Sequence, residues 1–126
     1  MTTATQQVTT TQQVASRFHE LAQQGNWNQI QDELFSKDAK SIEPAGSQGL
    51  KSVSGLDKIK AKAKEWDEMV EETHGGYCNE PQVAGKYFSC AMGADVTMKG
   101  QGRTTMDEIA LYEVKDGKIV SEQFFY

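Results

Sequence analysis

Three glutamates stand among apolar residues, where an ionisable side chain has a chemical use. Glu43 comes directly before Pro44, at the end of a short strand-like run. Glu108 and Glu122 lie in the two apolar arms of the segment MDEIALYEVKDGKIVSEQFFY, residues 106–126. Carboxyl groups that share an apolar pocket raise one another's pKa and can then exchange protons near neutral pH. His74, whose side chain titrates in the same range, is the fourth candidate acid or base.

Each of these residues also has a structural interpretation, and the sequence leaves both open. Glu43 could pair with a lysine or with water where its strand leaves the sheet. Glu108 or Glu122 could pair with Arg103 or Lys86, or could bind a water, a cation or an amine ligand. His74 could be a hydrogen-bonded structural residue. The histidines and cysteines lack the spacing of a metal site, so we expect no metal and no other cofactor.

The elements that must position these residues can be predicted from hydrophobic period and turn signals. Apolar residues at helical spacing predict three helices. The first runs from Val14 to Gly25, and the second follows an N-cap at Asn26 with Gln29 as its capping-box partner. The third follows an N-cap at Ser54 with Asp57 as its capping-box partner. Strands are predicted over 39–43, 72–83, 86–98, 103–114 and 118–126. Two short helices, a strand, a long helix and a four-strand meander indicate an α+β domain.

Composition limits the class of protein. The 126 residues carry a formal net charge of −5, so no basic surface is available for nucleic acid. No apolar stretch is long enough to span a bilayer and no signal peptide is visible, so we expect a cytoplasmic protein without a membrane partner. Cys78 and Cys90 are then expected to be free thiols.

Two further segments are assigned from their composition alone. Residues 1–13 are rich in Thr and Gln and are expected to be a disordered tail, followed by one domain over 14–126. The predicted long helix carries a run of basic residues that we interpret as a solvated face: Lys58, Lys60, Lys62 and Lys64.

The order of these features resembles the SnoaL-like and ketosteroid-isomerase-like branch of the nuclear transport factor 2-like superfamily. The resemblance covers 14–126 and rests on Gly25-Asn26-Trp27, on 39–44 running into Ala45-Gly46-Ser47, on Ser54-Gly55-Leu56, and on the closing hairpin around Asp116-Gly117. It implies a cone-shaped α+β barrel, with three N-terminal helices packed on a strongly curved mixed or antiparallel sheet. It also implies a pocket between the helices and the sheet, and a homodimer, but not one activity.

The closing hairpin can be oriented in two ways. A type I′ turn pairs Tyr112 with Ser121, whereas a three-residue bulged turn pairs Tyr112 with Val120 and Ala110 with Glu122. We favour the bulged turn, because isomerase-like relatives place the residues matching Glu122, Phe124 and Tyr126 in the pocket. The pocket face then carries Met106, Glu108, Ala110, Tyr112, Glu122, Phe124 and Tyr126. The outer face carries a predicted dimer patch of Ile109, Leu111, Ile119 and Phe125.

The resemblance identifies Glu43 with the general base of the ketosteroid isomerases. It also shows that both oxyanion donors of that reaction are missing, because Phe18 stands at the tyrosine position and Ala110 at the aspartic acid position. We therefore expect a protein that binds a small hydrophobic or enolisable molecule, with carboxylate acid–base chemistry of an isomerase or cyclase type. The alternative is a non-catalytic dimeric module with a filled cone. The expected ligand-contacting residues are Phe18, Trp66, Met106, Ala110, Tyr112, Phe124 and Tyr126.

Overall fold

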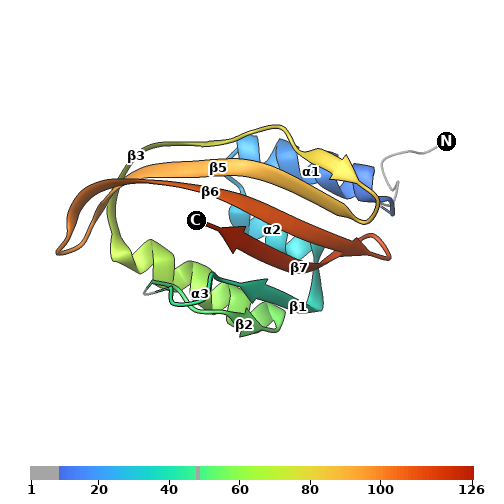
Figure 1. Ribbon diagram of the computed structural model, residues 1–126, viewed down its shortest axis with the longest axis horizontal. Coiled ribbons are helices and arrows are strands. Elements are labelled where there is room, and N and C mark those ends of the chain that lie inside the picture. The colour runs from blue at the N-terminus through green and yellow to red at the C-terminus, as the bar shows by residue number, and fades with distance from the viewer. Residues whose placement is uncertain (1–8, 48) are drawn as a thin grey trace.

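A computed structural model describes residues 9–47 and 49–126, and three helices in it pack on one curled sheet (Figure 1). The helices are α1 (Thr11–Gln23), α2 (Trp27–Leu34) and α3 (Leu56–Met69). The strands are β1 (Phe35–Ile42), β2 (Val53–Ser54), β3 (Val70–Cys78), β4 (Gln82–Ala84), β5 (Tyr87–Met98), β6 (Gly102–Lys115) and β7 (Lys118–Phe125). None of the helices in these residues is long and apolar enough to cross a membrane.

The sheet is mixed and does not close on itself. Its seven strands run in the order β2-β1-β7-β6-β5-β3, with β4 pairing on β5. β1 and β7 are parallel, and the remaining pairs are antiparallel. The predicted α+β class and curled sheet are thereby confirmed, with an open rather than a closed barrel.

The element boundaries differ from the predicted ones for local reasons. Helix α1 begins at Thr11, earlier than Val14, because Thr10 and Gln13 form a capping box. Residues 1–8 of the predicted tail lie outside the described residues. The capping bonds predicted for the other two helices are wrong. Asn26 makes no side-chain cap bond, and α3 is capped by Gly55 at a φ of 100°, which leaves Ser54 in β2.

Two strands also have other bounds than predicted. β1 starts at Phe35, directly after α2, and its first residue pairs with Ile119. Phe35 is buried in the core, and this burial favours a strand conformation at residue 35 instead of a loop. The predicted strand over 72–83 is divided into β3 and β4, because Pro81 cannot donate a ladder hydrogen bond.

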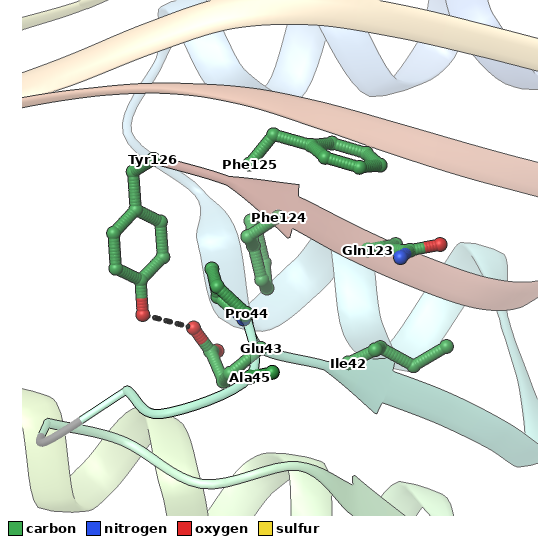
Figure 2. A pocket seen from close by; sticks show the side chains of 8 residues that line it. All are labelled: Ile42, Glu43, Pro44, Ala45, Gln123, Phe124, Phe125 and Tyr126. Atoms are coloured by element: carbon green, nitrogen blue, oxygen red, sulfur yellow. Dashed lines mark hydrogen bonds between the residues drawn. The ribbon is translucent and has the colours of Figure 1, made fainter.

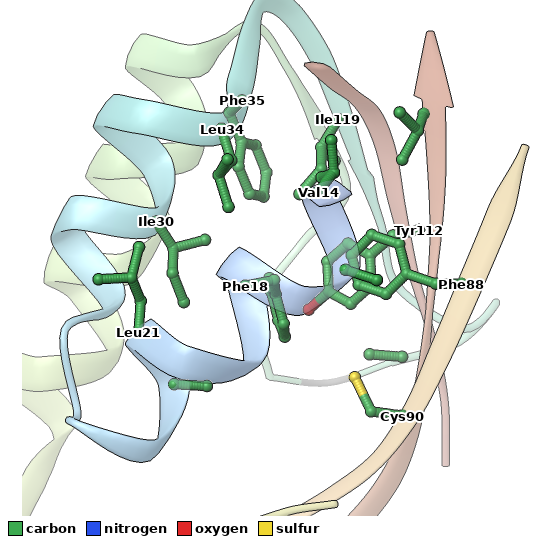
Figure 3. Close-up of a cluster of buried hydrophobic side chains, with 14 of the residues drawn as sticks. Val14, Phe18, Leu21, Ile30, Leu34, Phe35, Phe88, Cys90, Tyr112 and Ile119 are labelled. Atoms are coloured by element: carbon green, nitrogen blue, oxygen red, sulfur yellow. The ribbon is translucent and has the colours of Figure 1, made fainter. Parts of the chain in front are cut away.

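Aromatic side chains fill the space between α1 and the middle of the sheet (Figure 3). The ring of Phe18 lies 4.7 Å from that of Tyr112 and 5.3 Å from that of Phe88, measured between centroids. Tyr112 and Phe88 stack at 4.8 Å across β5 and β6. The deep end of the cone is therefore solid core.

The closing hairpin has a turn that we did not favour. Asp116 and Gly117 both have positive φ, 52° and 76°, as a type I′ turn requires, and Lys115 pairs with Lys118 across them. The ladder then shifts by one residue at a bulge, because Val114 pairs with Ile119 but Glu113 pairs with Ser121. Val120 is the extra residue. The favoured three-residue turn is therefore wrong.

The faces of the hairpin nevertheless come out largely as predicted. Tyr112 pairs with Glu122 and Ala110 with Phe124, so these side chains share the inner face. Ile109 and Phe125 lie on the outer face, 47% and 48% exposed. Ile119 does not join them, because it precedes the bulge and faces inward, with an exposed fraction of 0%. Its assignment to the outer patch is wrong.

Candidate functional site

The parallel pairing of β1 and β7 brings two of the predicted glutamates to one place. Ser41 pairs with Glu122 and Ile42 with Gln123, so Glu43 follows beside Phe124 at the rim of the cone. Pro44 ends β1 there, since it has no N–H to continue the ladder. The chain then loops back, and the backbone N–H of Glu43 donates to the Ser52 hydroxyl at 2.8 Å. Glu43 is thus fixed at the strand end.

The carboxylate of Glu43 is held at both oxygens. The Tyr126 hydroxyl donates to Oε1 at 2.7 Å, as Figure 2 shows, and the Lys62 ammonium lies 2.5 Å from Oε2. The Tyr126 oxygen also lies 3.0 Å from the Ser47 hydroxyl. The Glu43 side chain is only 7% exposed, so the ion pair is buried rather than a surface contact.

Lys62 was predicted to lie on a solvated helix face, and that prediction is wrong for this lysine. Its side chain is 8% exposed. The ammonium donates to the Ser41 hydroxyl at 2.7 Å and lies 5.5 Å from the centre of the Phe124 ring. Ile59, one helical turn earlier, is also buried, so Lys62 lies on the inner face of α3. The helix thereby places a cation among the carboxylates.

The other two glutamates have pKa values shifted towards neutrality. Burial raises the pKa of Glu122 to about 7, although the Ser41 hydroxyl and Lys62 lower it, and Glu43 adds a smaller increase. Burial likewise raises the pKa of Glu108 to about 7, with additional increases from the charges of Glu43 and Glu122. The charge of Glu43 therefore acts on both of the other carboxyl groups, and the charge of Glu122 acts on Glu108. We call Ser41, Glu43, Lys62, Glu108, Glu122 and Tyr126 the mouth cluster.

A depression of about 540 Å³ lies beside the mouth cluster. We call it the rim depression, and it opens between the ends of β1 and β7 (Figure 2). Its lining residues are Ile42, Glu43, Pro44, Ala45, Gln123, Phe124, Phe125 and Tyr126. Most of these side chains are apolar, and Glu43, Gln123 and Tyr126 supply the polar groups. The volume suits a small organic molecule.

The predicted ligand-contacting residues divide into three groups. Phe124 and Tyr126 line the rim depression. Phe18, Ala110 and Tyr112 are buried in the core and are not among the lining residues. Trp66 and Met106 are partly buried and stay outside the lining.

His74 is not brought to the mouth cluster. It lies on β3, where its Nε2 is 2.7 Å from the Thr97 hydroxyl and its Nδ1 is 3.7 Å from a Glu72 oxygen. The contacts of the three carboxyl groups do not include it. The structural interpretation of His74 fits these neighbours. Within the described residues, no three His, Cys, Asp or Glu side chains are arranged to hold a metal ion.

Sequence reasoning missed two members of the mouth cluster, Lys62 and Ser41. A signal for each was present in the sequence. Lys62 stands three residues after Ile59, which belongs to the predicted apolar stripe of the helix, and Ser41 stands two residues before Glu43 and so on the same face of the strand. The charge of the lysine run concealed the first signal, because charged residues are rarely fully buried unless paired.

Comparison with known proteins gives a consistent assignment. The profile of the SnoaL-like domain matches residues 9–126. A Mesorhizobium loti protein assigned as a SnoaL-like polyketide cyclase is 36% identical, with a TM-score of 0.87 over 93% of this chain and 99% of that one. No match was found among proteins with curated descriptions.

More distant solved structures share the fold alone. A nuclear transport factor 2-like protein from Burkholderia thailandensis is 15% identical, with a TM-score of 0.77 over 92% of this chain and 89% of that one. A Catenulispora acidiphila protein with a ketosteroid isomerase-like fold is 20% identical, with a TM-score of 0.66 over 90% of this chain and 84% of that one. The resemblance read from the sequence is thereby confirmed for family and for fold.

Proposed function

The chain belongs to the SnoaL-like domain family, and from this membership and the geometry of the mouth cluster we propose that it binds a small enolisable molecule and moves protons on it. The reaction is of isomerase or cyclase type and needs no cofactor. One observation carries this proposal: the buried ion pair of Glu43 with Lys62 and the hydroxyl of Tyr126 meet at the edge of the rim depression, and burial raises the pKa of the nearby Glu108 and Glu122 to about 7. At neutral pH each group is therefore present both as an acid and as a base.

The two carboxyl groups take different roles because their exposure differs. Glu122 is buried, whereas Glu108 is only partly buried. Continuing the β6–β7 register by one residue places Glu108 beside Tyr126, which lines the rim depression. Glu108 is therefore the group that meets the ligand. Glu122 sets the charge around it, since its own ionisation raises the pKa of Glu108.

The proton transfer proceeds in two steps. The Glu108 carboxylate takes a proton from a carbon next to the ligand's carbonyl, and the C–H electron pair forms an enolate with its charge on oxygen. The Glu108 carboxylic acid then returns this proton to another carbon of a conjugated enolate, which gives an isomer and restores the carboxylate. In a cyclisation the enolate carbon instead attacks an electrophilic carbonyl of the same molecule, and a carboxylic acid protonates the new alkoxide.

Glu43 has a positioning role in this proposal. Both of its oxygens are already bound, one to Tyr126 and one to Lys62. Neither oxygen is free to face a ligand while these two contacts are in place. Glu43 therefore holds the ammonium and the hydroxyl in place.

A second function is favoured by the filled core. Phe18, Phe88 and Tyr112 occupy the deep end of the cone, so a ligand is limited to the rim. A non-catalytic dimeric module would have the same filling. The activity experiment described below separates the two, because such a module would not accelerate proton transfer.

The outer sheet face suits a second copy of the chain. Ile109, Leu111 and Phe125 form an apolar patch there, and Ile109 and Phe125 are about half exposed. Patches of this kind usually mark an interface. Phe125 also lines the rim depression, so a homodimer would wall the site on that side. Light scattering after size exclusion tests this, and a monomer for the wild type would contradict it, while Ile109→Glu is expected to give a monomer.

The proton-transfer proposal can be tested without knowing the natural ligand. Nitrobenzisoxazole loses one carbon-bound proton to a base, its N–O bond breaks, and a coloured cyanophenolate forms. We expect turnover to rise with pH around a midpoint of about 7, the pKa of Glu108. Glu108→Gln should lower the rate by about 10²-fold or more. Glu122→Gln should move the midpoint to lower pH, because a neighbouring negative charge is removed.

Glu68→Gln serves as the matched control, because Glu68 is an exposed acid on α3 outside the mouth cluster. Its rate and pH midpoint should equal those of the wild type. Turnover by the wild type no faster than in a carboxylate buffer, or a Glu108→Gln variant with unchanged rate, would refute the proposed acid–base chemistry.

A further inference from the structure

An enolate formed in the rim depression needs a donor for its oxygen, and the expected positions do not supply one. Phe18 and Ala110 carry no hydrogen-bond donor in their side chains, and both are buried in the core. Loss of one oxyanion donor typically costs about 10²–10³-fold in rate. A proton-transfer site without any such donor would be inefficient, so the donor must be sought elsewhere in the mouth cluster.

We propose that Lys62 is that donor, a catalytic residue whose ammonium binds the oxygen that becomes negatively charged. This inference rests on the proposed function and deepens it. An ammonium has three N–H bonds. One is donated to the Ser41 hydroxyl at 2.7 Å, and the ammonium forms an ion pair with the Glu43 carboxylate at 2.5 Å. On the remaining side lies the Phe124 ring, with its centre at 5.5 Å.

Phe124 lies between the Lys62 ammonium and the rim depression. Phe124 is partly buried, lines the rim depression and also covers the ammonium. A ring face is a weak partner for a cation compared with an oxygen that gains negative charge. Rotation of the Phe124 side chain would therefore exchange a weak contact for a strong one. Glu43 and Ser41 meanwhile keep the nitrogen in place.

The ion pair with Glu43 determines which chemistry Lys62 performs. A lysine that forms an imine with a carbonyl must first lose a proton, because the neutral amine is the nucleophile. The Lys62 nitrogen is instead held between the Ser41 hydroxyl and the Glu43 carboxylate, and attack on a carbonyl would require both contacts to break. Lys62 is therefore a hydrogen-bond donor and not a nucleophile.

The charge balance of the site also indicates the class of substrate. Glu43 and Lys62 neutralise one another, and each ionised carboxyl among Glu108 and Glu122 adds one negative charge. A ligand with a permanent carboxylate or phosphate would be repelled by these groups when the base is ionised. An uncharged ketone or related carbonyl compound, which becomes negative only during reaction, fits the site.

The test compares an anionic ligand with a neutral one of the same shape. A dinitrophenol is ionised at about pH 6 and carries its charge on an oxygen as an enolate does, whereas its methyl ether is neutral. Calorimetry of the wild type at about pH 6 should show tighter binding of the phenolate, because Glu108 and Glu122, with pKa values of about 7, are then mostly uncharged and do not repel it. In Lys62→Met that preference should fall by at least about tenfold, with less than about threefold change for the ether. Lys64→Met, an exposed position of the same helix, should match the wild type.

A folding defect is handled with a charge-balanced variant. Lys62→Met/Glu43→Gln removes both members of the ion pair and is compared with Glu43→Gln alone, and the same loss of preference is expected. The inference is overturned if Lys62→Met weakens both ligands equally, because the residue is then only structural. It is also overturned if borohydride traps an aldehyde on Lys62, which would make it a nucleophile.

The two proposals fail in different ways. A wild type that binds neither compound and does not turn over nitrobenzisoxazole contradicts the proposed function itself. A wild type that does both, with the phenolate preference intact in Lys62→Met, contradicts only the role of Lys62.

Discussion

Replacing Lys62 by methionine leaves the Glu43 carboxylate buried without its ion-pair partner. The two side chains are 8% and 7% exposed, so water cannot take over the lost contact without rearrangement. Removal of one member of a buried pair costs about 3–5 kcal/mol, against about 0–1 kcal/mol for an exposed pair. We therefore expect Lys62→Met to lower the free energy of unfolding by about 3–5 kcal/mol at neutral pH, a large part of the roughly 5–15 kcal/mol typical of a domain.

The cost should come mainly from the unpaired charge and not from lost packing. Methionine keeps most of the lysine volume, so a second substitution that removes the opposing charge should recover stability. We expect Lys62→Met/Glu43→Gln to lie within about 1–2 kcal/mol of the wild type, since the double variant leaves no buried charge without a partner. Lys64→Met, exposed on the same helix, should change stability by less than about 0.5 kcal/mol.

Urea unfolding followed by circular dichroism measures these differences. All variants must be compared at one protein concentration, because the stability of a dimer depends on concentration. A cost below about 1 kcal/mol for Lys62→Met would mean that the pair is solvated. A double variant no more stable than Lys62→Met would mean that the two charges are not coupled. Either result would refute the electrostatic description of the mouth cluster.

Three further substitutions test other parts of the structure. Burial raises the pKa of Glu122 from 4.5 to about 7. Between these two pH values the unfolded chain releases the proton and the folded chain keeps it, so the wild type loses stability as the pH rises from 4.5 to 7. Urea unfolding should show Glu122→Gln more stable than the wild type by up to about 3 kcal/mol at pH 8 and nearly equal at pH 4. Tyr126→Phe removes the 2.7 Å bond to Glu43 and should cost about 0.5–1.5 kcal/mol, with faster amide exchange in residues 45–47 and 49–52. At Gly93 a Cβ would lie 2.6 Å from the Met106 carbonyl oxygen, so Gly93→Ala should lower stability by about 1–3 kcal/mol, whereas Gly75→Ala, with nothing within 4 Å, should cost much less in the same melts.

The fold could be predicted because its signals are local. The apolar stripe of α3, the Asp116-Gly117 turn and the glycine between the first two helices each act over a few residues. Their order along the chain was then specific enough to indicate the family. The capping boxes show the limit of such signals. A matching residue pair was present at Asn26 and at Ser54, but the bonds did not form there.

The site could be predicted only in part because its contacts are remote in sequence. Lys62 meets Ser41 across 21 positions, and Tyr126 meets Glu43 across 83. Hydrophobic patterning indicates which face of a strand is buried, but not which polar side chains meet across that face. The three glutamates were found because each interrupts an apolar pattern. Lys62 was missed because it stands among other lysines, and its burial depends on partners that no local pattern reveals.

The hairpin shows how a wrong turn can still give the right site. Strand side chains alternate, so a register error of two residues leaves every residue on its face. The favoured turn paired Ala110 with Glu122, and the structure pairs it with Phe124, which is an error of two. The type I′ turn alone would have placed Gln123 beside Ala110 and turned Glu122 outward. The extra residue at Val120 returns Glu122, Phe124 and Tyr126 to the inner face. Ile119, which precedes this residue in the strand, stays buried in the core. The chemistry proposed for the mouth cluster therefore depends on one bulge, because without it the carboxyl group of Glu122 and the ring that covers Lys62 would both face the outer surface.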